Sequence, residues 1–271
     1  MEQLAFWLPL ILIFASALVA GIVKRYTKDP CLKRFQGDQV HVRLKDGRWI
    51  SGCLRVYSNC LEVGLDPAPN EAAPFEKLSY VLYEHNLDSI DRILRPSPAE
   101  GTRERTIWER DIQKLLQPSL LHRLQRRIRN LFNMLRDAVA QSITILFGAV
   151  KKKTKLGTLP MDEGKVGEIG RSVISVVPNS YEPILERYLG RPVIVESPAP
   201  ENKIHEQIGV LQEYSAKYIL VRDVDHLADL PPLSRTGVVA TAFDVVFPRP
   251  ANTVRYLAQG KHKPLSLRKA A

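Results

Sequence analysis

The sequence predicts an α+β protein in which an N-terminal transmembrane helix precedes two small five-stranded β-barrels with a long basic amphipathic helix between them. Three observations predict this fold class: an uncharged apolar run near the N-terminus, an internal repeat of strand-like segments, and a basic stretch with helical periodicity between the two copies. We assign an anchor to residues 1–28, barrels to 29–96 and 183–258, the helical region to 97–155, a linker to 156–182 and a basic tail to 259–271.

The apolar run Leu4–Val23 contains 20 residues without a formal charge, enough for a helix to cross a bilayer. Three cations in residues 24–28 follow the run and only Glu2 precedes it, so the positive-inside rule predicts a single pass with the bulk of the chain in the cytoplasm. A cleaved signal peptide is the alternative, because Ala15-Ser16-Ala17 offers small residues for cleavage, but the run lacks a positive n-region. We therefore expect a protein of the bacterial inner membrane.

The 271-residue chain has the composition of a folded protein with a localised excess of positive charge. Its 39 Lys and Arg outnumber 29 Asp and Glu, which gives a net charge of +10 at pH 7. Residues 101–155 hold 13 of the basic and four of the acidic residues, so nearly all of the excess lies there. Three cysteines without a Cys-x-x-Cys pair predict neither a disulfide framework nor a zinc site, and we expect no cofactor.

Two segments of the chain repeat each other in the same order. At a constant offset of 153, seven positions within residues 30–42 match residues 183–195. A second block pairs Gly52, Leu54, Tyr57, Ser58 and Val63 with Gly209, Leu211, Tyr214, Ser215 and Leu220. A third pairs Val81, Tyr83 and Ile90 with Val245, Phe247 and Val254. Three blocks in one order predict two copies of one module.

The elements of the module follow from local patterns in its first copy. Pro30 to Phe35 predict a short helix, and the alternating apolar residues at 40–44 run into Asp46-Gly47, which is typical of a tight hairpin turn. Further strands are expected at 49–56, 61–65, 78–83 and 87–90. Gly52 inside a strand favours a bend, and five short strands in about 65 residues are typical of a small, strongly bent barrel.

The run Val40–Leu54 (VHVRLKDGRWISGCL) resembles the first motif of Sm-like (LSm) domains, where an alternating strand, an Asp-Gly turn and a bent glycine strand recur. The stretch Tyr83–Ile90 is similar to the second motif of the bacterial host-factor RNA chaperone, in which Tyr and His occupy these relative places. The resemblance implies two tandem Sm-like barrels that assemble into rings.

The same resemblance bears on RNA binding. It implies candidate RNA contacts at Tyr57, Asn59 and His85. However, the family's uracil pocket carries an Asp and an Asn where this chain has Ser58 and Glu62, and a carboxylate is unfavourable next to phosphate. The resemblance therefore supports the barrel and its assembly better than it supports RNA binding.

The basic region between the copies is expected to form a long helix, because apolar residues recur every three or four positions from Leu116 to Val150. The candidate contacts for a membrane surface or a partner protein are Arg123, Arg126, Arg127, Arg129, Lys151, Lys152 and Lys153. Three alternatives stay open: the apolar stripe packs on the barrels or on a neighbouring subunit, the basic face lies on anionic lipid, or it binds nucleic acid.

Motifs of enzymes are not found in the sequence. It has no P-loop, no Gly-x-Ser-x-Gly and no His-Glu-x-x-His, and its six histidines are scattered singly. We therefore predict a non-enzymatic, membrane-anchored scaffold whose barrels mediate oligomerisation, either as a homo-oligomeric ring or within a large membrane complex. A membrane-tethered RNA-binding module is the alternative function.

Overall fold

The computed structural model describes residues 28–65, 77–117, 182–199, 203–224, 227 and 242–258 of the chain. The predicted membrane helix at Leu4–Val23 and the seven candidate cations from Arg123 to Lys153 lie outside these residues, as do residues 156–181 of the predicted linker and the predicted tail. Within the described part, no helix is both long enough and apolar enough to span a bilayer.

The described residues form two halves with a helix between them. The first half contains α2 (Pro30–Lys33), β1 (Gln39–Leu44), β2 (Trp49–Val56), β3 (Cys60–Leu65), β4 (Ser79–Tyr83), the 3-10 helix η1 (Glu84–Ser89) and β5 (Ile90–Pro96). Helix α3 (Arg103–Leu116) follows. The second half contains α6 (Pro183–Tyr188), β6 (Pro192–Pro198), β7 (Ile204–Tyr214), β8 (Tyr218–Val224), β9 (Phe243–Pro248) and β10 (Thr253–Leu257).

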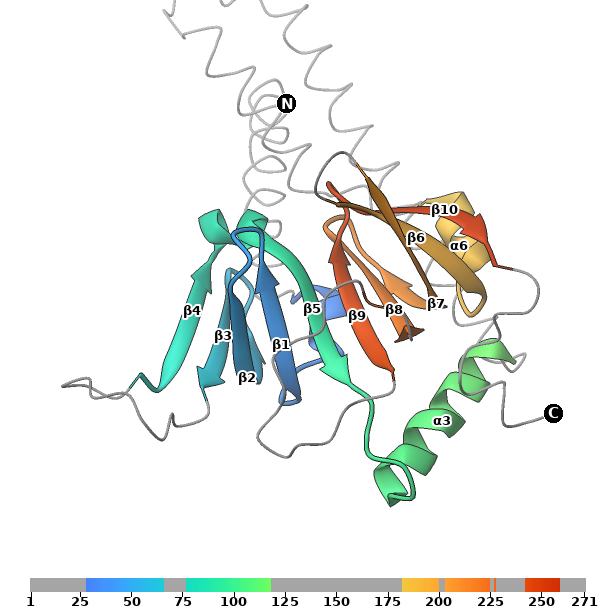
Figure 1. Cartoon of the computed structure of the whole chain (residues 1–271), viewed down its shortest axis with the longest axis horizontal. Coiled ribbons are helices and arrows are strands. Elements are labelled where there is room, and N and C mark those ends of the chain that lie inside the picture. The colour runs from blue at the N-terminus through green and yellow to red at the C-terminus, as the bar shows by residue number, and fades with distance from the viewer. Residues whose placement is uncertain are drawn as a thin grey trace, which may run out of the picture. The chain divides into compact units, whose positions relative to one another are not determined.

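All ten strands belong to one antiparallel sheet, in the order β10-β6-β7-β8-β9-β5-β1-β2-β3-β4 (Figure 1). The prediction of two separate five-stranded barrels is therefore wrong. Strands β5 and β9 join the halves through a ladder that runs from Ile93–Val246 to Pro96–Phe243, and we call this junction the seam. Among the described residues, nothing pairs with the outer side of β4 or of β10, so the sheet is open there and we call these sides the free edges.

The two halves have the same internal strand order. The second half runs β10-β6-β7-β8-β9, and the first half repeats this order as β5-β1-β2-β3-β4. Gly52 pairs with Val40 and Gly209 pairs with Val193, so both glycines occupy the same register position, as the repeat predicts. The first matched block of the repeat therefore describes real structural counterparts.

The later blocks of the repeat are displaced in the structure. A β-bulge between Leu211 and Glu213 inserts one residue into β7, and the counterparts after it shift accordingly. The counterparts, first half first, are Tyr57 and Ser215, Cys60 and Tyr218, Val63 and Val221, Leu82 and Phe247, and Ile93 and Val254. The predicted pairs of Tyr57 with Tyr214, Val63 with Leu220, Tyr83 with Phe247 and Ile90 with Val254 are thus wrong by one to three residues.

Two apolar cores meet at the seam and each contains residues of both halves. Ile93 belongs to the core of the first half and Leu94 to that of the second, because successive strand residues point to opposite faces. The first core also takes in Tyr218, Leu220 and Val246 of the second half. Strand β8 is buried along its whole length as a result, so neither half is packed independently of the other.

Gly52 allows a close approach of two strands, and replacing it tests the bend. An added Cβ at Gly52 would lie 2.0 Å from the carbonyl oxygen of Gly64. We expect Gly52→Ala to lower the free energy of unfolding by about 1–3 kcal/mol, because the backbone of β3 has to move. Urea unfolding followed by circular dichroism measures the change.

Gly64→Ala is the matched control on the facing strand. Its added Cβ would lie 3.7 Å from the carbonyl oxygen of Cys53, an ordinary contact. We expect Gly64→Ala to leave stability unchanged or to raise it slightly, since alanine reduces the entropy of the unfolded chain. Equal losses of unfolding free energy for Gly52→Ala and Gly64→Ala would contradict the close approach at Gly52 as the cause.

Candidate functional site

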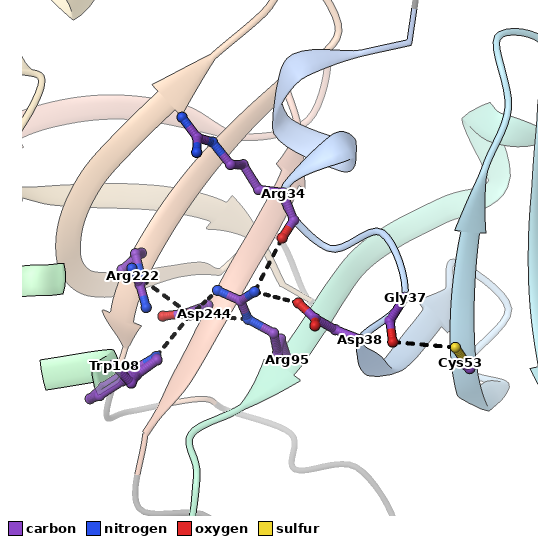
Figure 2. Close-up of polar contacts among 8 residues, drawn as sticks. All are labelled: Arg34, Gly37, Asp38, Cys53, Arg95, Trp108, Arg222 and Asp244. Carbon is purple, nitrogen blue, oxygen red and sulfur yellow. Dashed lines mark hydrogen bonds and ion pairs between the residues drawn. The ribbon is translucent and has the colours of Figure 1, made fainter. Parts of the chain in front are cut away.

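A buried carboxylate, that of Asp244 in β9, closes the seam. Its Oδ2 accepts hydrogen bonds from Arg95 (Nη2 at 2.6 Å and Nε at 3.2 Å), from Trp108 Nε1 at 2.9 Å and from Arg222 Nε at 3.2 Å (Figure 2). These donors come from β5, α3 and β8. Asp244 itself is fully buried. One side chain therefore joins the first half, the second half and helix α3.

The other oxygen of Asp244 stabilises an unusual piece of backbone. Asp223 has φ of +59°, in the left-handed region, at the bulge of β8 between Val221 and Val224. Aspartate tolerates this conformation better than most residues. The bulge directs the Asp223 N–H to Asp244 Oδ1 at 3.2 Å, so the carboxylate is satisfied on both oxygens.

Arg95 extends the cluster into the first half. Its Nη1 donates to Asp38 Oδ2 and to the carbonyl oxygen of Arg34, just before β1 (Figure 2). The guanidinium carbon lies 4.5 Å from the centroid of the Phe35 ring, within reach of a cation–π interaction. Arg95 therefore ties the segment between α2 and β1 to the seam.

The charges of the cluster compensate one another. Burial alone would raise the pKa of Asp244, but the guanidinium groups of Arg222 and Arg95 hold it below its ordinary value. The same carboxylate and Asp38 raise the pKa of Arg95 against the opposite effect of burial. Asp244 is thus an ionised group without solvent contact, and its role is to connect elements rather than to meet a substrate.

Helix α2 crosses the seam and packs on the second half. Asp29 caps this helix, accepting from the N–H groups of Cys31 and Leu32, and it also bonds the side chain of Ser215. Cys31 Sγ donates to the carbonyl oxygen of Tyr218 at 3.6 Å. The pKa of Asp29 is raised because burial outweighs these hydrogen bonds. The start of the first half is therefore fixed on β7 and β8.

Ion pairs at the surface border this contact. Arg34 Nη2 lies 3.9 Å from Glu213 Oε2, and Lys217 Nζ lies 4.0 Å from Glu84 Oε1. Each pair joins one residue of the first half to one of the second. Lys217 and Glu84 are both exposed, and such a pair contributes little stability, whereas Glu213 is buried beside the exposed Arg34. Both pairs favour one relative placement of the halves.

Large apolar side chains are exposed at the two free edges, whereas their counterparts at the seam are buried. Beside β4, Leu78 is 71% exposed, and its counterpart Phe243 is 6% exposed. On β10, Tyr256 is 53% exposed, and its counterpart Leu94 is 0% exposed. Tyr83 and Leu257 are exposed at the same edges. An open edge with apolar side chains is a surface that favours pairing with another strand.

The three candidate RNA contacts lie at one end of the first half. Tyr57 and Asn59 belong to the exposed turn between β2 and β3, and His85 lies in η1, where its ring stacks on Tyr83. Cys60 pairs with Tyr83, which brings the turn and η1 to the same end of the strands. Within the described residues, no group of His, Cys, Asp and Glu could hold a metal ion.

Carboxylates border these candidate contacts. Tyr57 Oη donates to Glu62 Oε2 at 3.1 Å, and this bond raises the pKa of Tyr57. Arg55 Nη1 lies 3.5 Å from Glu62 Oε1, so the exposed Arg55 is paired with this carboxylate. Lys28 Nζ lies 5.9 Å from the centroid of the Tyr57 ring and is an exposed cation beside the turn. The turn is therefore bordered by charges of both signs, whereas a nucleic-acid backbone is bound by a surplus of cations.

The Asp244 cluster was not found from the sequence. The available signal is a single acidic residue inside the apolar run Ala242–Phe247, which predicts a buried carboxylate and hence buried basic partners. Arg222, which follows the apolar run Tyr218–Val221, and Arg95, which follows Ile93 and Leu94, are such partners. Trp108 gives no comparable signal, because its indole N–H finds Asp244 only through the packing of α3.

Asp244→Asn tests the connecting role of the carboxylate. The substitution leaves the buried Arg222 without the charge of Asp244 and leaves the partly buried Arg95 with Asp38, so we expect a loss of about 3 kcal/mol in the free energy of unfolding at pH 7. Because the folded pKa of Asp244 is lowered, its contribution is complete above the unfolded aspartate pKa of about 3.9 and falls as the pH drops through the folded value. Urea unfolding at pH 7 and at pH 3 measures both effects.

Asp111→Asn on α3 is the control for this prediction. The side chain of Asp111 is 48% exposed and, among the described residues, pairs with the exposed Lys114 at 3.4 Å, so its loss is expected to cost less than about 1 kcal/mol. A difference between wild type and Asp244→Asn that is as large at pH 3 as at pH 7 would contradict the ionised state of Asp244.

No family model, curated protein or solved structure matches this chain. The resemblance of residues 40–54 to Sm-like domains stays a prediction, and the function of the chain has to be argued from the geometry of the seam and the free edges.

Proposed function

We propose that this chain is an assembly scaffold in which β4 of one copy pairs with β10 of the next. The observation that carries the proposal is the repeated strand order. Because β9 is the counterpart of β4 and β5 is the counterpart of β10, the two free edges are the counterparts of the two strands that form the seam. The pairing that joins the halves can therefore recur between chains.

The backbone groups at the free edges have the directions that this pairing needs. Leu65 N donates to Leu78 O at 2.9 Å, and alternation along an antiparallel ladder then points the N–H groups of Ser79 and Val81 away from β3. Ala258 N donates to Pro192 O at 3.0 Å, so the N–H of Leu257 points away from β6. Both free edges thus carry outward donors and acceptors.

The seam also supplies a register for the pairing between copies. Transferred to the counterparts, its ladder aligns Val81 with Val254, Tyr80 with Tyr256 and Ser79 with Leu257. Leu257 stands where the seam has Arg95, and Ser79 where it has Asp244. The aligned residues of the contact between copies are therefore uncharged, which removes the desolvation cost of a buried ion pair. Arg255, at the bulge of β10, is paired with Glu196 of β6 at 2.9 Å.

The contact is heterologous, since two different edges meet. Repetition of such a contact produces a closed ring if the rotation per copy closes, and a filament if it does not. Both products bring the exposed apolar side chains of the two free edges together. A scaffold of this kind holds many copies at a fixed spacing.

Two proline variants test the pairing together. Val81→Pro and Leu257→Pro each remove an outward N–H and leave the ladder within the sheet intact, so each alone is expected to weaken self-association at least about tenfold. An equimolar mixture is expected to form dimers, because each variant keeps the edge that the other lacks. Native mass spectrometry of the full-length chains counts the copies in each assembly. All samples are kept in the same detergent, because residues 4–23 form an uncharged apolar run.

Ile107→Lys is the control, because Ile107 is a comparably exposed apolar residue of α3, which is neither of the two edge strands. We expect it to assemble as the wild type does. Wild-type chains that stay monomeric, or variants that assemble like the wild type, would overturn the proposal. Dimers of Leu257→Pro alone would indicate that β4 pairs with β4 instead.

A further inference from the structure

Helices α2 and α6 are counterparts. Helix α2 packs on the other half of the chain across the seam, whereas α6 makes no such contact with the described residues. Leu32 of α2 and Leu185 of α6 are both buried in cores. Cys31 of α2 is 0% exposed and lies on β8 across the seam, whereas its counterpart Ile184 of α6 is 59% exposed. The side of α6 that corresponds to the seam contact of α2 is therefore uncovered.

We propose that α6 of one copy packs on the turn between β2 and β3 of the next copy, with Ile184 against Tyr57 and Cys60. The inference rests on the proposed function, because the next copy is placed by the pairing of β10 with β4. Cys31 contacts Tyr218, and Asp29 contacts Ser215, across the seam. The counterparts of Tyr218 and Ser215 are Cys60 and Tyr57.

The side chains of this contact are suited to one another. Ile184 is larger than Cys31, and Tyr57 is larger and more apolar than Ser215, which offsets the smaller Cys60 in the place of Tyr218. Both Ile184 and Tyr57 are exposed in the single copy. In the assembly Ile184 faces the Tyr57 ring, beside which Lys28 Nζ lies 5.9 Å from the ring centroid.

The charges around the contact differ from those at the seam. At the seam, Arg34 pairs with Glu213. The counterpart of Arg34 is Arg187, which is exposed, and the counterpart of Glu213 is Arg55, so two arginines stand where the seam has an ion pair. Glu62, which lies 3.5 Å from Arg55, is the carboxylate that offsets this repulsion. Tyr57 and Asn59 then belong to a protein interface.

Cysteine crosslinking tests the contact between copies. Cys60 is partly exposed, so Ile184→Cys places a second thiol opposite it in the assembled protein. We expect a short bis-maleimide to link full-length chains into a ladder on a denaturing gel, and mass spectrometry to identify the linked peptides around residues 184 and 60. Adding Cys60→Ser is expected to abolish the ladder, and Ile107→Cys is expected to form no link to Cys60.

Val81→Pro separates this inference from the proposed function. In this background, loss of both assembly and the 184–60 link is the expected result. A second outcome would overturn the α6 contact and leave edge pairing in place. In that outcome Val81→Pro abolishes assembly, Ile184→Cys gives no link to Cys60, and Ile184→Lys assembles as tightly as the wild type. If neither assembly nor crosslinking responds to Val81→Pro, the edge pairing fails first, and this inference fails with it.

Discussion

The carboxylate of Asp244 is the interaction on which the described structure depends. A buried charge is costly unless several donors reach it, and here Arg95, Arg222, Trp108 and the N–H of Asp223 all do so. Those donors lie on β5, β8 and α3, so the carboxylate is satisfied only when both halves and the helix are in place. The seam is consequently an all-or-none feature of the fold.

This constraint explains why the halves are not two independent barrels. Strand β8 has no exposed face, since residues of the first half and of the second half cover it from opposite sides. Helix α2 belongs to the first half in sequence but lies on the second in space. Separating the halves would expose Tyr218, Leu220 and Val246 and leave Asp244 without Arg95. The folding unit is therefore the pair of halves.

The parts of the fold that the sequence predicted well are those governed by local chemistry. Alternation at Val40 to Leu44 and the turn at Asp46-Gly47 each depend on neighbours within one hairpin, and each lies in the structure where it was predicted. At Gly52 a bend was predicted, and the structure shows a close approach to the carbonyl oxygen of Gly64. The last strand was misplaced: residues 87–89 are in η1, and β5 continues to Pro96. Its charged residues hide the strand pattern, because Arg95 is balanced by a residue 149 positions away.

The same distinction separates the candidate site from the fold. Tyr57, Asn59 and His85 came from a resemblance, and the structure adds that Glu62 and Arg55 already pair beside Tyr57. Asp244 and its donors could not be paired from the sequence, because period-two patterns assign a residue to a face but do not select the neighbouring strand. The repeat predicts the strand order of both halves, but it does not predict the Asp244 cluster. The counterpart of Asp244 is Ser79 and that of Arg95 is Leu257, so the ion pair occurs only once in the chain's two halves.

The ion pair between Arg95 and Asp244 suits the pairing of β5 with β9 to a permanent junction within one chain. Its absence at the counterparts Leu257 and Ser79 suits the pairing of β10 with β4 to assembly between chains. Within one chain, β5 and β9 are always at high effective concentration, so the cost of burying Arg95 and Asp244 is met once, during folding. Separate copies would have to desolvate such charges at every encounter. The free edges carry Leu78, Tyr256 and Leu257 and avoid this cost, because Arg255 of β10 is already paired with Glu196 of the neighbouring strand. The repeated strand order supplies the geometry. A reversible pairing between chains with the geometry of the seam therefore requires edges without the Arg95–Asp244 ion pair.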